Sequence, residues 1–304
     1  MENVFFDDFS SFPLGPFPYD PNHSAMGEYH CYPEKGYKGA WFDPIADWDY
    51  KGPSWLVTSP RMDGCNLMEQ MRMKSPREKV AVPVLRAGDT RWRDYRVSVQ
   101  LRAFTDSEIS GILFRYQTSM MHYGFFLKGG SVELQRVSKL ERKVLASAPL
   151  KWSTDEFHTL EVEVKGSRID CYADGVHMIF AEDDTYSEGC IALSACMPTQ
   201  YRCVSVMMEE DALRAFEDRK ESDRRRIEEK RSKFPQMKLS KTIDLKDFGA
   251  GRQIRFGHLK GDDELFFIMA QNQRRVYKDR YPFISCLTAV SMETGEVLDR
   301  KSVV

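Results

Sequence analysis

Aromatic rings and acidic side chains are interleaved in an early, proline-rich stretch of the chain. Trp41, Trp48 and Trp55 lie there beside Asp43 and Asp47, and eight prolines from position 13 to position 60 interrupt any regular strand pairing. Sugar rings present flat C–H faces and a rim of hydroxyl groups, so saccharide sites combine a stacking aromatic with carboxylate, amide or guanidinium groups. We therefore expect at least one of the three tryptophans to face a saccharide. The alternative is that these rings seal one edge of a folded core.

The acidic residues of the same stretch suggest a second chemistry. Asp43, Asp47 and Asp49 could hold a calcium ion, because calcium takes several oxygen ligands from a flexible loop. The D-x-D-G pattern of a calcium loop is absent. The sequence therefore predicts no metal site and no cofactor, with calcium left as an open alternative.

Arg115 lies among large apolar residues in a predicted strand, residues 111–117, where strict alternation puts it on the same face as Leu113. A buried guanidinium needs acceptors, because an unpaired buried charge is costly. We expect Arg115 to bind a sugar hydroxyl or a uronate carboxylate, to which its planar fork is matched. The alternative is an ion pair with Glu133 or Glu163 on a neighbouring strand.

His122 and Tyr123 follow at or beside the tip of the hairpin that residues 111–117 form with residues 123–127. The mouth of a groove would lie at this tip, so we include both residues among the candidate ligand-binding residues. The alternative is an ordinary polar turn.

The elements that must position these residues are strands. Residues 108–206 alternate between apolar and polar side chains in short runs separated by turns, with Leu160 and Val162 facing a core and Glu161 and Glu163 facing away. Asp174-Gly175 is a strong two-residue hairpin signal. Strands at this spacing, without helical periodicity between them, predict an all-β fold of two packed antiparallel sheets.

Several runs within these strands carry a family resemblance: Gly111-Ile-Leu-Phe-Arg-Tyr-Gln, Tyr123-Gly-Phe, Leu160-Glu-Val-Glu-Val-Lys-Gly-Ser-Arg-Ile, Asp174-Gly-Val and Asp183-Asp-Thr-Tyr-Ser-Glu-Gly-Cys-Ile-Ala-Leu. Together they resemble a concanavalin A-like, laminin-G-type jelly roll. They are most similar to the keto-disaccharide hydrolase-like domains that accompany bacterial glycoside hydrolases and polysaccharide lyases. The resemblance covers roughly residues 4–208. It implies a jelly-roll sandwich, but such sandwiches host lectins, hydrolases and adhesion modules alike.

Catalytic signatures are weak. Retaining glycosidases on this general fold carry an E-x-D-x-x-E strand, whereas Glu161 and Glu163 share a face but are only two residues apart. The sequence also lacks a G-x-S-x-G turn, an H-E-x-x-H helix and a phosphate-binding glycine loop. Whether the chain is an enzyme stays open, and a groove site that uses unassigned carboxylates or His122 is the alternative to simple binding.

The C-terminal third changes character. Residues 209–235 form a charge run whose i, i+4 pairs favour a solvated helix, with Leu213 and Phe216 able to dock its first turns. Residues 236–304 are predicted to be β-structure. The run from Phe256 to Leu265 resembles a loop of rhamnogalacturonan lyase-like β-propellers, although His258 and Lys260 stand where that family has aspartates.

One propeller blade cannot close a ring, so we expect further blades or a partner chain to cover this C-terminal part. The predicted organisation is therefore a concanavalin A-like sandwich (1–208), a charged helical linker (209–235) and an incomplete propeller-like blade (236–304).

Composition excludes some functions. Forty-four basic residues against 46 acidic ones leave a formal charge of −2, which disfavours nucleic acid and anionic membranes as partners. No apolar run is long enough to span a bilayer, and the first residues show no basic region followed by an apolar stretch, as a secretion signal would. The chain as written is therefore expected to be cytoplasmic, or secreted or periplasmic if an upstream signal was lost. Seven widely spaced cysteines fit reduced thiols better than a disulfide framework or a zinc site.

The sequence thus favours a carbohydrate-binding sandwich of a polysaccharide-lyase-like protein that acts on rhamnose- and uronate-containing glycans, with an oligo- or polysaccharide as its ligand. A hydrolase or lyase with its site in the sandwich groove is the first alternative. A non-catalytic assembly module whose aromatic loop contacts protein is the second.

Overall fold

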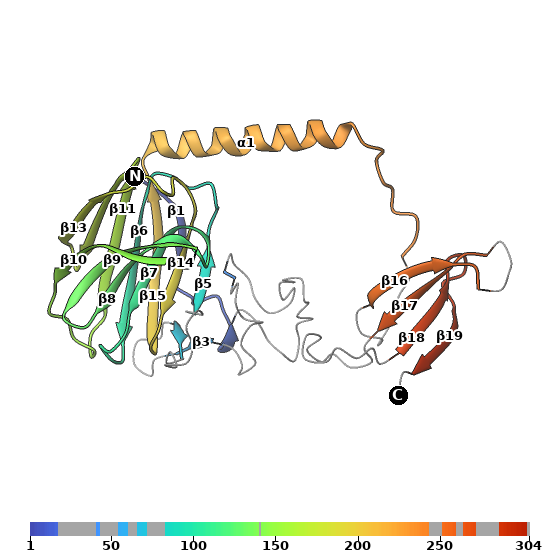
Figure 1. The fold of residues 1–304 in the computed structure, drawn as a ribbon, viewed down its shortest axis with the longest axis horizontal. Helices are drawn as coiled ribbons and strands as arrows, with labels where there is room; N and C mark the ends of the chain where they lie inside the picture. Colours follow the sequence, from blue (N-terminus) through green and yellow to red (C-terminus); the bar gives the residue numbers. More distant parts are fainter. Residues whose placement is uncertain are drawn as a thin grey trace. The chain divides into compact units, whose positions relative to one another are not determined.

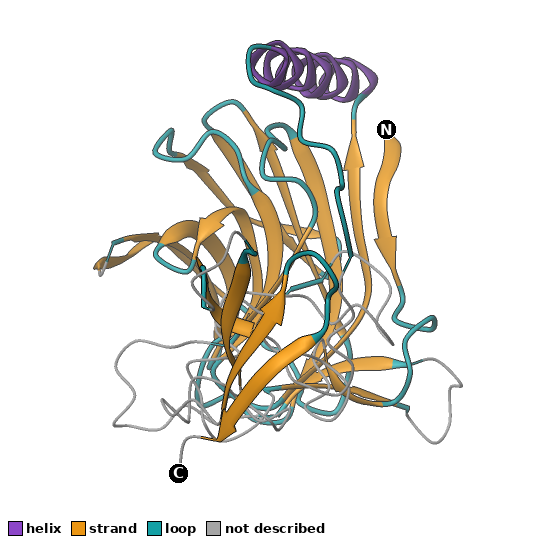
Figure 2. Cartoon of the chain, turned by 90° about the vertical axis from the view of Figure 1, so that its right-hand side faces the viewer, coloured by secondary structure: helices purple, strands orange, loops and turns teal. Residues whose placement is uncertain are grey.

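The structure is a computed structural model that describes residues 1–17, 41–42, 54–59, 66–71, 83–139, 141–242, 251–259, 264–271 and 286–302. The chain divides into two compact units. Described residues up to Lys230 belong to the first unit, and those from Arg231 onward belong to the second. Figure 1 labels the elements along the chain. Strands dominate both units, as the colouring in Figure 2 makes plain.

The first unit contains two large antiparallel sheets. Sheet A has nine strands, which in spatial order are β13 (Val176–Glu182), β12 (Arg168–Ala173), β11 (His158–Lys165), β6 (Tyr95–Ala103), β15 (Thr199–Met208), β4 (Leu67–Gln70), β3 (Trp55–Thr58) and β2 (Gly15–Phe17), with β1 (Glu2–Asp7) also paired to β15. Sheet B has six strands in the order β10 (Glu141–Pro149), β9 (Ser131–Ser138), β8 (Met121–Lys128), β7 (Ser110–Thr118), β14 (Cys190–Ala195) and β5 (Val84–Ala87). The predicted all-β, two-sheet sandwich is confirmed.

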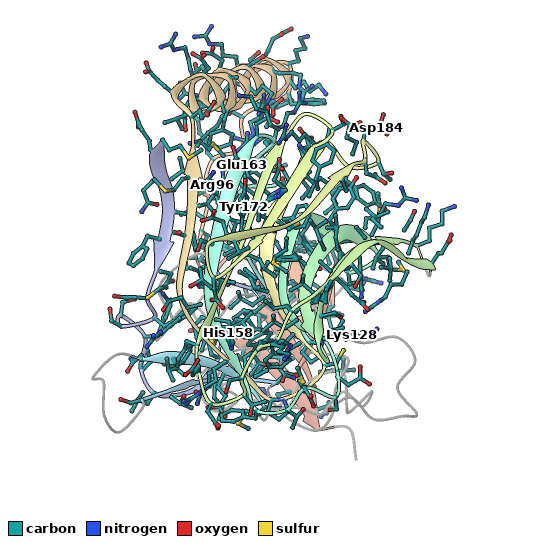
Figure 3. The ribbon with its side chains drawn as sticks, turned by 90° about the vertical axis from the view of Figure 1, so that its left-hand side faces the viewer. Arg96, Lys128, His158, Glu163, Tyr172 and Asp184 are labelled. Atoms are coloured by element: carbon teal, nitrogen blue, oxygen red, sulfur yellow. The ribbon has the colours of Figure 1, made fainter. Side chains whose placement is uncertain are left out.

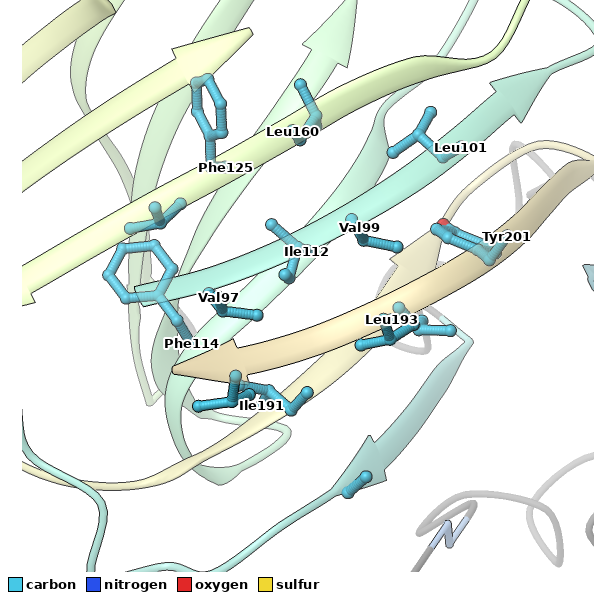
Figure 4. Packing of buried hydrophobic residues seen from close by; sticks show 14 of the residues in the cluster. Val97, Val99, Leu101, Ile112, Phe114, Phe125, Leu160, Ile191, Leu193 and Tyr201 are labelled. Atoms are coloured by element: carbon cyan, nitrogen blue, oxygen red, sulfur yellow. The ribbon is translucent and has the colours of Figure 1, made fainter. Parts of the chain in front are cut away.

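The core lies between the two sheets, where inward-facing side chains of both meet (Figure 4). On β6, Val97, Val99 and Leu101 are fully buried, and the residues that alternate with them are half-buried. Ile112 of β7 and Leu193 of β14 face them from sheet B. Burial of each such side chain stabilises the folded state by about 1.5–3 kcal/mol. The alternating apolar residues therefore supply the main free energy that holds the two sheets together.

The hairpin turn between β12 and β13 follows the sequence prediction. Asp174 and Gly175 both have positive φ, 49° and 78°, as a type I′ turn requires. The Asp174 carboxylate accepts hydrogen bonds from the Thr159 amide at 2.8 Å and lies 2.7 Å from His158 Nδ1. These contacts tie the turn to the start of β11.

Strict alternation fails in β7, and the structure corrects the predicted faces. Arg115 has a φ of 43°, and the pairing of β7 with β8 shifts register between Phe114 and Thr118. In the pairing with β14, the three positions from Leu113 to Tyr116 oppose only two positions of the partner, so this β-bulge contains one extra residue. As a result, Leu113 and Tyr116 belong to the same buried cluster although simple alternation separates them. Gly189 lies against the bulge, where a Cβ would come within 2.3 Å of the Arg115 carbonyl carbon.

Helix α1 (Glu210–Ser232) follows β15 directly. Glu210 and Asp211 in its first turn are favourable near the positive end of the helix dipole. Phe216 is buried, and Ala212 and Leu213 pack against the sandwich core, as predicted for the first turns. The compact unit that contains the sandwich extends to Lys230. The helix residues up to Lys230 therefore lie in the same compact unit as the sandwich.

The second unit contains a four-stranded antiparallel sheet in the order β16 (Gly251–Gly257), β17 (Phe266–Gln271), β18 (Cys286–Ser291) and β19 (Val297–Ser302). Phe267 and Val290, which are cross-strand partners, are buried. The turn between β18 and β19 has Gly295 at a φ of 77°, which glycine adopts without strain.

Within the described residues, α1 is not apolar enough to cross a membrane.

Candidate functional site

The tryptophans predicted to stack on a saccharide have internal positions. Trp41 is 4% exposed, its Nε1 donates to Asp7 Oδ2 at 2.7 Å, and its ring packs edge-on against Phe5. Trp55 is fully buried in the core beside Tyr201. Both rings are buried members of the core cluster, as the alternative of sealing the core expects.

Other predicted residues of this stretch cannot be placed. Trp48 and the calcium candidates Asp43, Asp47 and Asp49 lie outside the described residues. Among the residues that the structure does describe, no group of three or more His, Cys, Asp or Glu side chains could hold a metal ion. Among the described cysteines, Cys171, Cys190 and Cys196 are buried thiols, whereas Cys203 is half-buried.

Arg115 is buried, with 1% of its side chain exposed, and its hydrogen-bond acceptors are backbone carbonyls. Its Nη1 donates to Tyr186 O at 3.1 Å, and its Nη2 donates to Gly166 O at 2.7 Å and to Arg93 O at 3.1 Å. The nearest carboxylate oxygen, on Asp94, is 3.6 Å away. Arg115 therefore ties three loops together. Its guanidinium is bonded to backbone carbonyls, and not to Glu133 or Glu163 as the alternative expected.

His122 and Tyr123 occupy opposite faces of β8. His122 is 6% exposed, stacks on Tyr116, and places Nδ1 3.1 Å from Thr118 O. Burial lowers the pKa of His122 to about 4, so the ring is neutral near pH 7. A neutral, stacked and nearly buried ring is poorly suited to serve as a proton donor or a sugar ligand.

Tyr123 is fully buried on the inner face of sheet B. Its hydroxyl donates to Asp183 Oδ1 at 2.5 Å and accepts from the Tyr186 amide at 3.1 Å, and burial raises its pKa. Because Arg115 also binds Tyr186, the structure brings Arg115 and Tyr123 together around one loop residue. The pair supports the loop, and both side chains are buried at the place where the sequence led us to expect the mouth of a groove.

A different surface gathers exposed polar and aromatic groups. Pairing of β6, β11, β12 and β13 aligns their outward side chains in two rows, which we call the Arg96 face: Arg96, Glu163, Asp170 and Phe180 in one row, and Ser98, Glu161, Tyr172 and His177 in the other. Figure 3 shows Arg96, Glu163 and Tyr172 close together on this sheet. Directly opposed residues on neighbouring strands lie within contact distance, so each row is continuous.

Arg96 organises the centre of this face. Its guanidinium forms ion pairs with Glu163 and with Glu161, the latter at 3.5 Å, and its Cζ lies 5.8 Å from the Tyr172 ring centroid. Hydrogen bonding to Glu163 raises the pKa of Arg96, so the cation is permanent. Both carboxylates are thereby oriented by one cation while each remains about a quarter exposed.

The neighbouring strands complete the face. Asp170 accepts from Arg168 Nε at 2.5 Å and lies 2.9 Å from His177 Nε2, and the bond from Arg168 lowers its pKa below the usual range. Phe180 is half exposed, with Arg168 Cζ 5.1 Å from its centroid. The face therefore offers an exposed aromatic ring, fixed hydrogen-bond acceptors and cationic donors within a few strands.

A pocket of about 270 Å³ adjoins the same residues. Arg96 and Glu163 line it together with Lys165 of β11 and, from the start of α1, Asp211 and Ala212. The docked first turns of α1 thus form one wall. The sequence indicated that Glu161 and Glu163 point away from the core. It contains no local signal that β11 pairs with β6, because Arg96 and Glu163 are 67 positions apart.

No protein-family model matches the chain, and no curated protein does so either. Solved structures that are similar to it include the carbohydrate-binding module CBM66 from Bacillus subtilis, with a TM-score of 0.45 and 15% identity over 56% of this chain and 96% of that one. A xylan beta-1,4-xylosidase from Bacillus halodurans has a TM-score of 0.39 and 10% identity, covering 60% of this chain and 41% of that one. The galectin LEC-6 from Caenorhabditis elegans has a TM-score of 0.34 and 15% identity, covering 46% and 96%.

Proposed function

We propose that the sandwich, residues 1–208, binds a glycan, and that the Arg96 face is its binding surface. The observation that carries this proposal is the meeting of Arg96, Glu163 and Tyr172 from three neighbouring strands beside an open pocket. Arg96, Glu163 and Tyr172 are partly exposed, whereas the candidates Trp41, Trp55 and Arg115 are buried.

The chemistry of this face fits a sugar better than an apolar ligand. Glu161 and Glu163 are acceptors for pairs of sugar hydroxyls, and their pairing with Arg96 holds them in place before a ligand arrives. Such preorganisation reduces the ordering cost of binding. Phe180 supplies an exposed ring for the C–H face of a sugar.

In this proposal the sandwich is the accessory domain of a polysaccharide-lyase-like protein that acts on rhamnose- and uronate-containing glycans. The four-stranded sheet β16–β19 is a propeller-like blade that contributes to the remaining part of that protein. Its order of four antiparallel strands agrees with the architecture of a blade.

The test is binding of the full chain to a panel of pectic and arabinogalactan oligosaccharides, measured by calorimetry. Glu163→Gln removes the charge that pairs with Arg96, and we expect it to weaken binding by about tenfold or more, since hydrogen bonds to charged groups contribute about 1.5–3 kcal/mol. Glu133→Gln is the matched control, because Glu133 is also a half-buried, outward glutamate and pairs with Lys128 at 3.0 Å, but on sheet B. Equal losses in the two variants, or no binding by the unmodified chain, would refute the proposal.

A glycoside hydrolase on the same surface is the second candidate function. Glu161 and Glu163 are two residues apart on the same face of β11, and both carboxylates contact the Arg96 guanidinium, so they form a neighbouring pair of acidic groups such as a glycosidase needs. Release of reducing ends from the same oligosaccharide panel, abolished by Glu161→Gln, supports this candidate. Binding without turnover supports the binding domain.

A further inference from the structure

One outward row of sheet A continues beyond the Arg96 face. From Ser98 of β6 it extends through β15 to β1, so that directly opposed residues of five neighbouring strands form it: Phe6, Ser205, Ser98, Glu161 and Tyr172. We call these residues the Phe6 row. Neighbouring strands are about 4.8 Å apart, so the row extends about 19 Å from β1 to β12. An oligosaccharide of several units fits along it.

Phe6 places an aromatic ring at the β1 end of this row. It is 56% exposed, whereas its neighbour Phe5 packs edge-on against Trp41 and Trp92. Successive residues of a strand point to opposite faces, so Phe6 faces outward beside Ser205. Its flat apolar face is therefore available to the C–H groups of a sugar ring.

Two serines lie in the middle of the Phe6 row. Ser98 and Ser205 are cross-strand partners, and both are half-buried. Their short side chains leave space above the sheet, and each hydroxyl both donates and accepts hydrogen bonds, as a sugar hydroxyl does. Glu161, the partner of Ser98 on β11, adds a carboxylate that pairs with Arg96 at 3.5 Å. The row thus combines a ring for stacking with hydrogen-bonding groups for hydroxyls.

The pocket of about 270 Å³ opens beside the middle of this row. Arg96 and Glu163, which line it, are two residues away from Ser98 and Glu161 on their strands, a step of about 6.6 Å. Figure 3 shows Arg96 and Glu163 nearer to the helix than Tyr172 is. A group that leaves the Phe6 row at its middle and points toward α1 therefore enters the pocket.

Helix α1 limits what the pocket holds. Asp211, Ala212 and Ala215 line it from the first turns of the helix, with Met207 and Lys165 from the sheet. Pockets for drug-sized ligands have volumes of about 300–1,000 Å³, so this one has room for a single sugar ring. Its lining offers both apolar surface and charged hydrogen-bonding groups, which is the combination that a sugar ring needs.

We infer that the sandwich binds a branched glycan, with the main chain along the Phe6 row and a branch of one sugar unit in the pocket. A linear chain that ended in the pocket would leave the row at its middle and would contact only one of the two rings Phe6 and Tyr172. A branched chain contacts both rings and fills the pocket at the same time. This inference rests on the proposed glycan-binding function and adds the architecture of the ligand.

The experiment compares branched and linear forms of one backbone, bound to the full chain and measured by calorimetry. The probes are a rhamnogalacturonan oligosaccharide with single galactose branches, an arabinogalactan oligosaccharide with single arabinose branches, and the linear backbone left when the branches of each are removed enzymatically. We expect a branched form to bind at least about tenfold more tightly than its own backbone, because the pocket adds hydrogen bonds to charged groups. Equal or tighter binding of the linear backbones would overturn the inference.

A larger side chain in the pocket tests where the branch binds. Ala215→Phe is expected to remove the preference for the branched form, and Ala215→Leu, which fills less of the pocket, is expected to reduce it. Asp218→Phe is the matched control, because Asp218 is also exposed on α1 but lies outside the pocket lining. A preference that survives both changes at Ala215 would show that the branch does not occupy the pocket.

Changes at Phe6 test the course of the main chain. Phe6→Ala is expected to weaken binding of the branched and linear forms alike, by about three- to tenfold, because a stacked ring is lost. Phe6→Leu keeps apolar bulk without the flat face, and we expect it to lose nearly as much. Phe104→Ala is the control, because Phe104 is 44% exposed and follows β6 at the end away from Arg96. Unchanged affinity in both Phe6 variants would remove the main chain from the Phe6 row.

Failure of the inference is distinguishable from failure of the proposed function. If branched and linear forms bind equally and both lose affinity in Glu163→Gln, the Arg96 face binds a glycan but the pocket holds no branch. If no probe binds, both proposals are overturned.

Discussion

The backbone amide of Arg115 donates a hydrogen bond of 2.7 Å to the hydroxyl oxygen of Tyr95. Tyr95 begins β6 in sheet A, whereas Arg115 is the bulged residue of β7 in sheet B. A bulge frees one amide from its own ladder, and here a side chain of the opposite sheet accepts it. This hydrogen bond between the two sheets therefore explains the positive φ of Arg115.

Tyr95→Phe tests this explanation. Removal of the hydroxyl leaves the buried Arg115 amide without its acceptor, and we expect the free energy of unfolding to fall by about 1–3 kcal/mol. Urea denaturation followed by tryptophan fluorescence measures the change. Tyr172→Phe, on the partly exposed face of β12, is the control and is expected to change stability by less than about 0.5 kcal/mol. Equal effects of the two changes would remove the special role of Tyr95.

Arg115→Ala is expected to destabilise the sandwich by about 3 kcal/mol or more, because the carbonyls of Arg93, Gly166 and Tyr186 lose a shared charged donor. At temperatures where the variant stays folded, oligosaccharide affinity should not change. Thermal unfolding and calorimetry separate the two effects. A loss of affinity with unchanged stability would restore the ligand-binding interpretation of this residue.

His122 should make stability depend on pH. Its folded pKa of about 4 lies below the unfolded value near 6.5, so the folded state favours the neutral ring. The stabilisation is therefore fully present above pH 6.5 and is lost as the pH falls from 6.5 to 4, where the unfolded chain binds the additional proton, for a total of about 3 kcal/mol. Urea unfolding at pH 7.5 and pH 4.5 should show a smaller decrease for His122→Gln than for the unmodified chain. Identical decreases would contradict the assignment.

Phe216 should hold α1 on the sandwich. It is 6% exposed and belongs to the core cluster, so Phe216→Ala is expected to cost about 3–5 kcal/mol and to release the first turns of the helix. Hydrogen exchange of the helix amides reports the release directly. Ile227→Ala, at a position on the same helix that is 46% exposed, is the control and should leave exchange of the first turns unchanged. Unchanged exchange in Phe216→Ala would show that other contacts hold the helix.

Much of the fold followed from local patterns. The two-residue alternation around Leu160 and Glu161, and the turn at Asp174-Gly175, are properties of neighbouring residues, and they were sufficient to predict strands, hairpins and a two-sheet sandwich. The docking of Phe216 likewise followed from a lone large ring in a charged helix. These features depend on side-chain polarity and backbone preference, which the sequence states directly.

The candidate site was decided by tertiary structure. The sequence alone showed that Trp41 and Trp55 lie in a proline-rich stretch and that Arg115 lies among apolar residues. Only the packing showed that all three side chains face inward. A ring that seals a core and a ring that stacks on a sugar can have the same neighbours in the sequence. The Arg96–Glu163 pair joins strands 67 positions apart, and Arg102 meets Gln200 across 98 positions. Strand order and bulges determine such meetings through the balance of burial and hydrogen bonding over the whole sandwich, a balance that no short stretch of sequence contains.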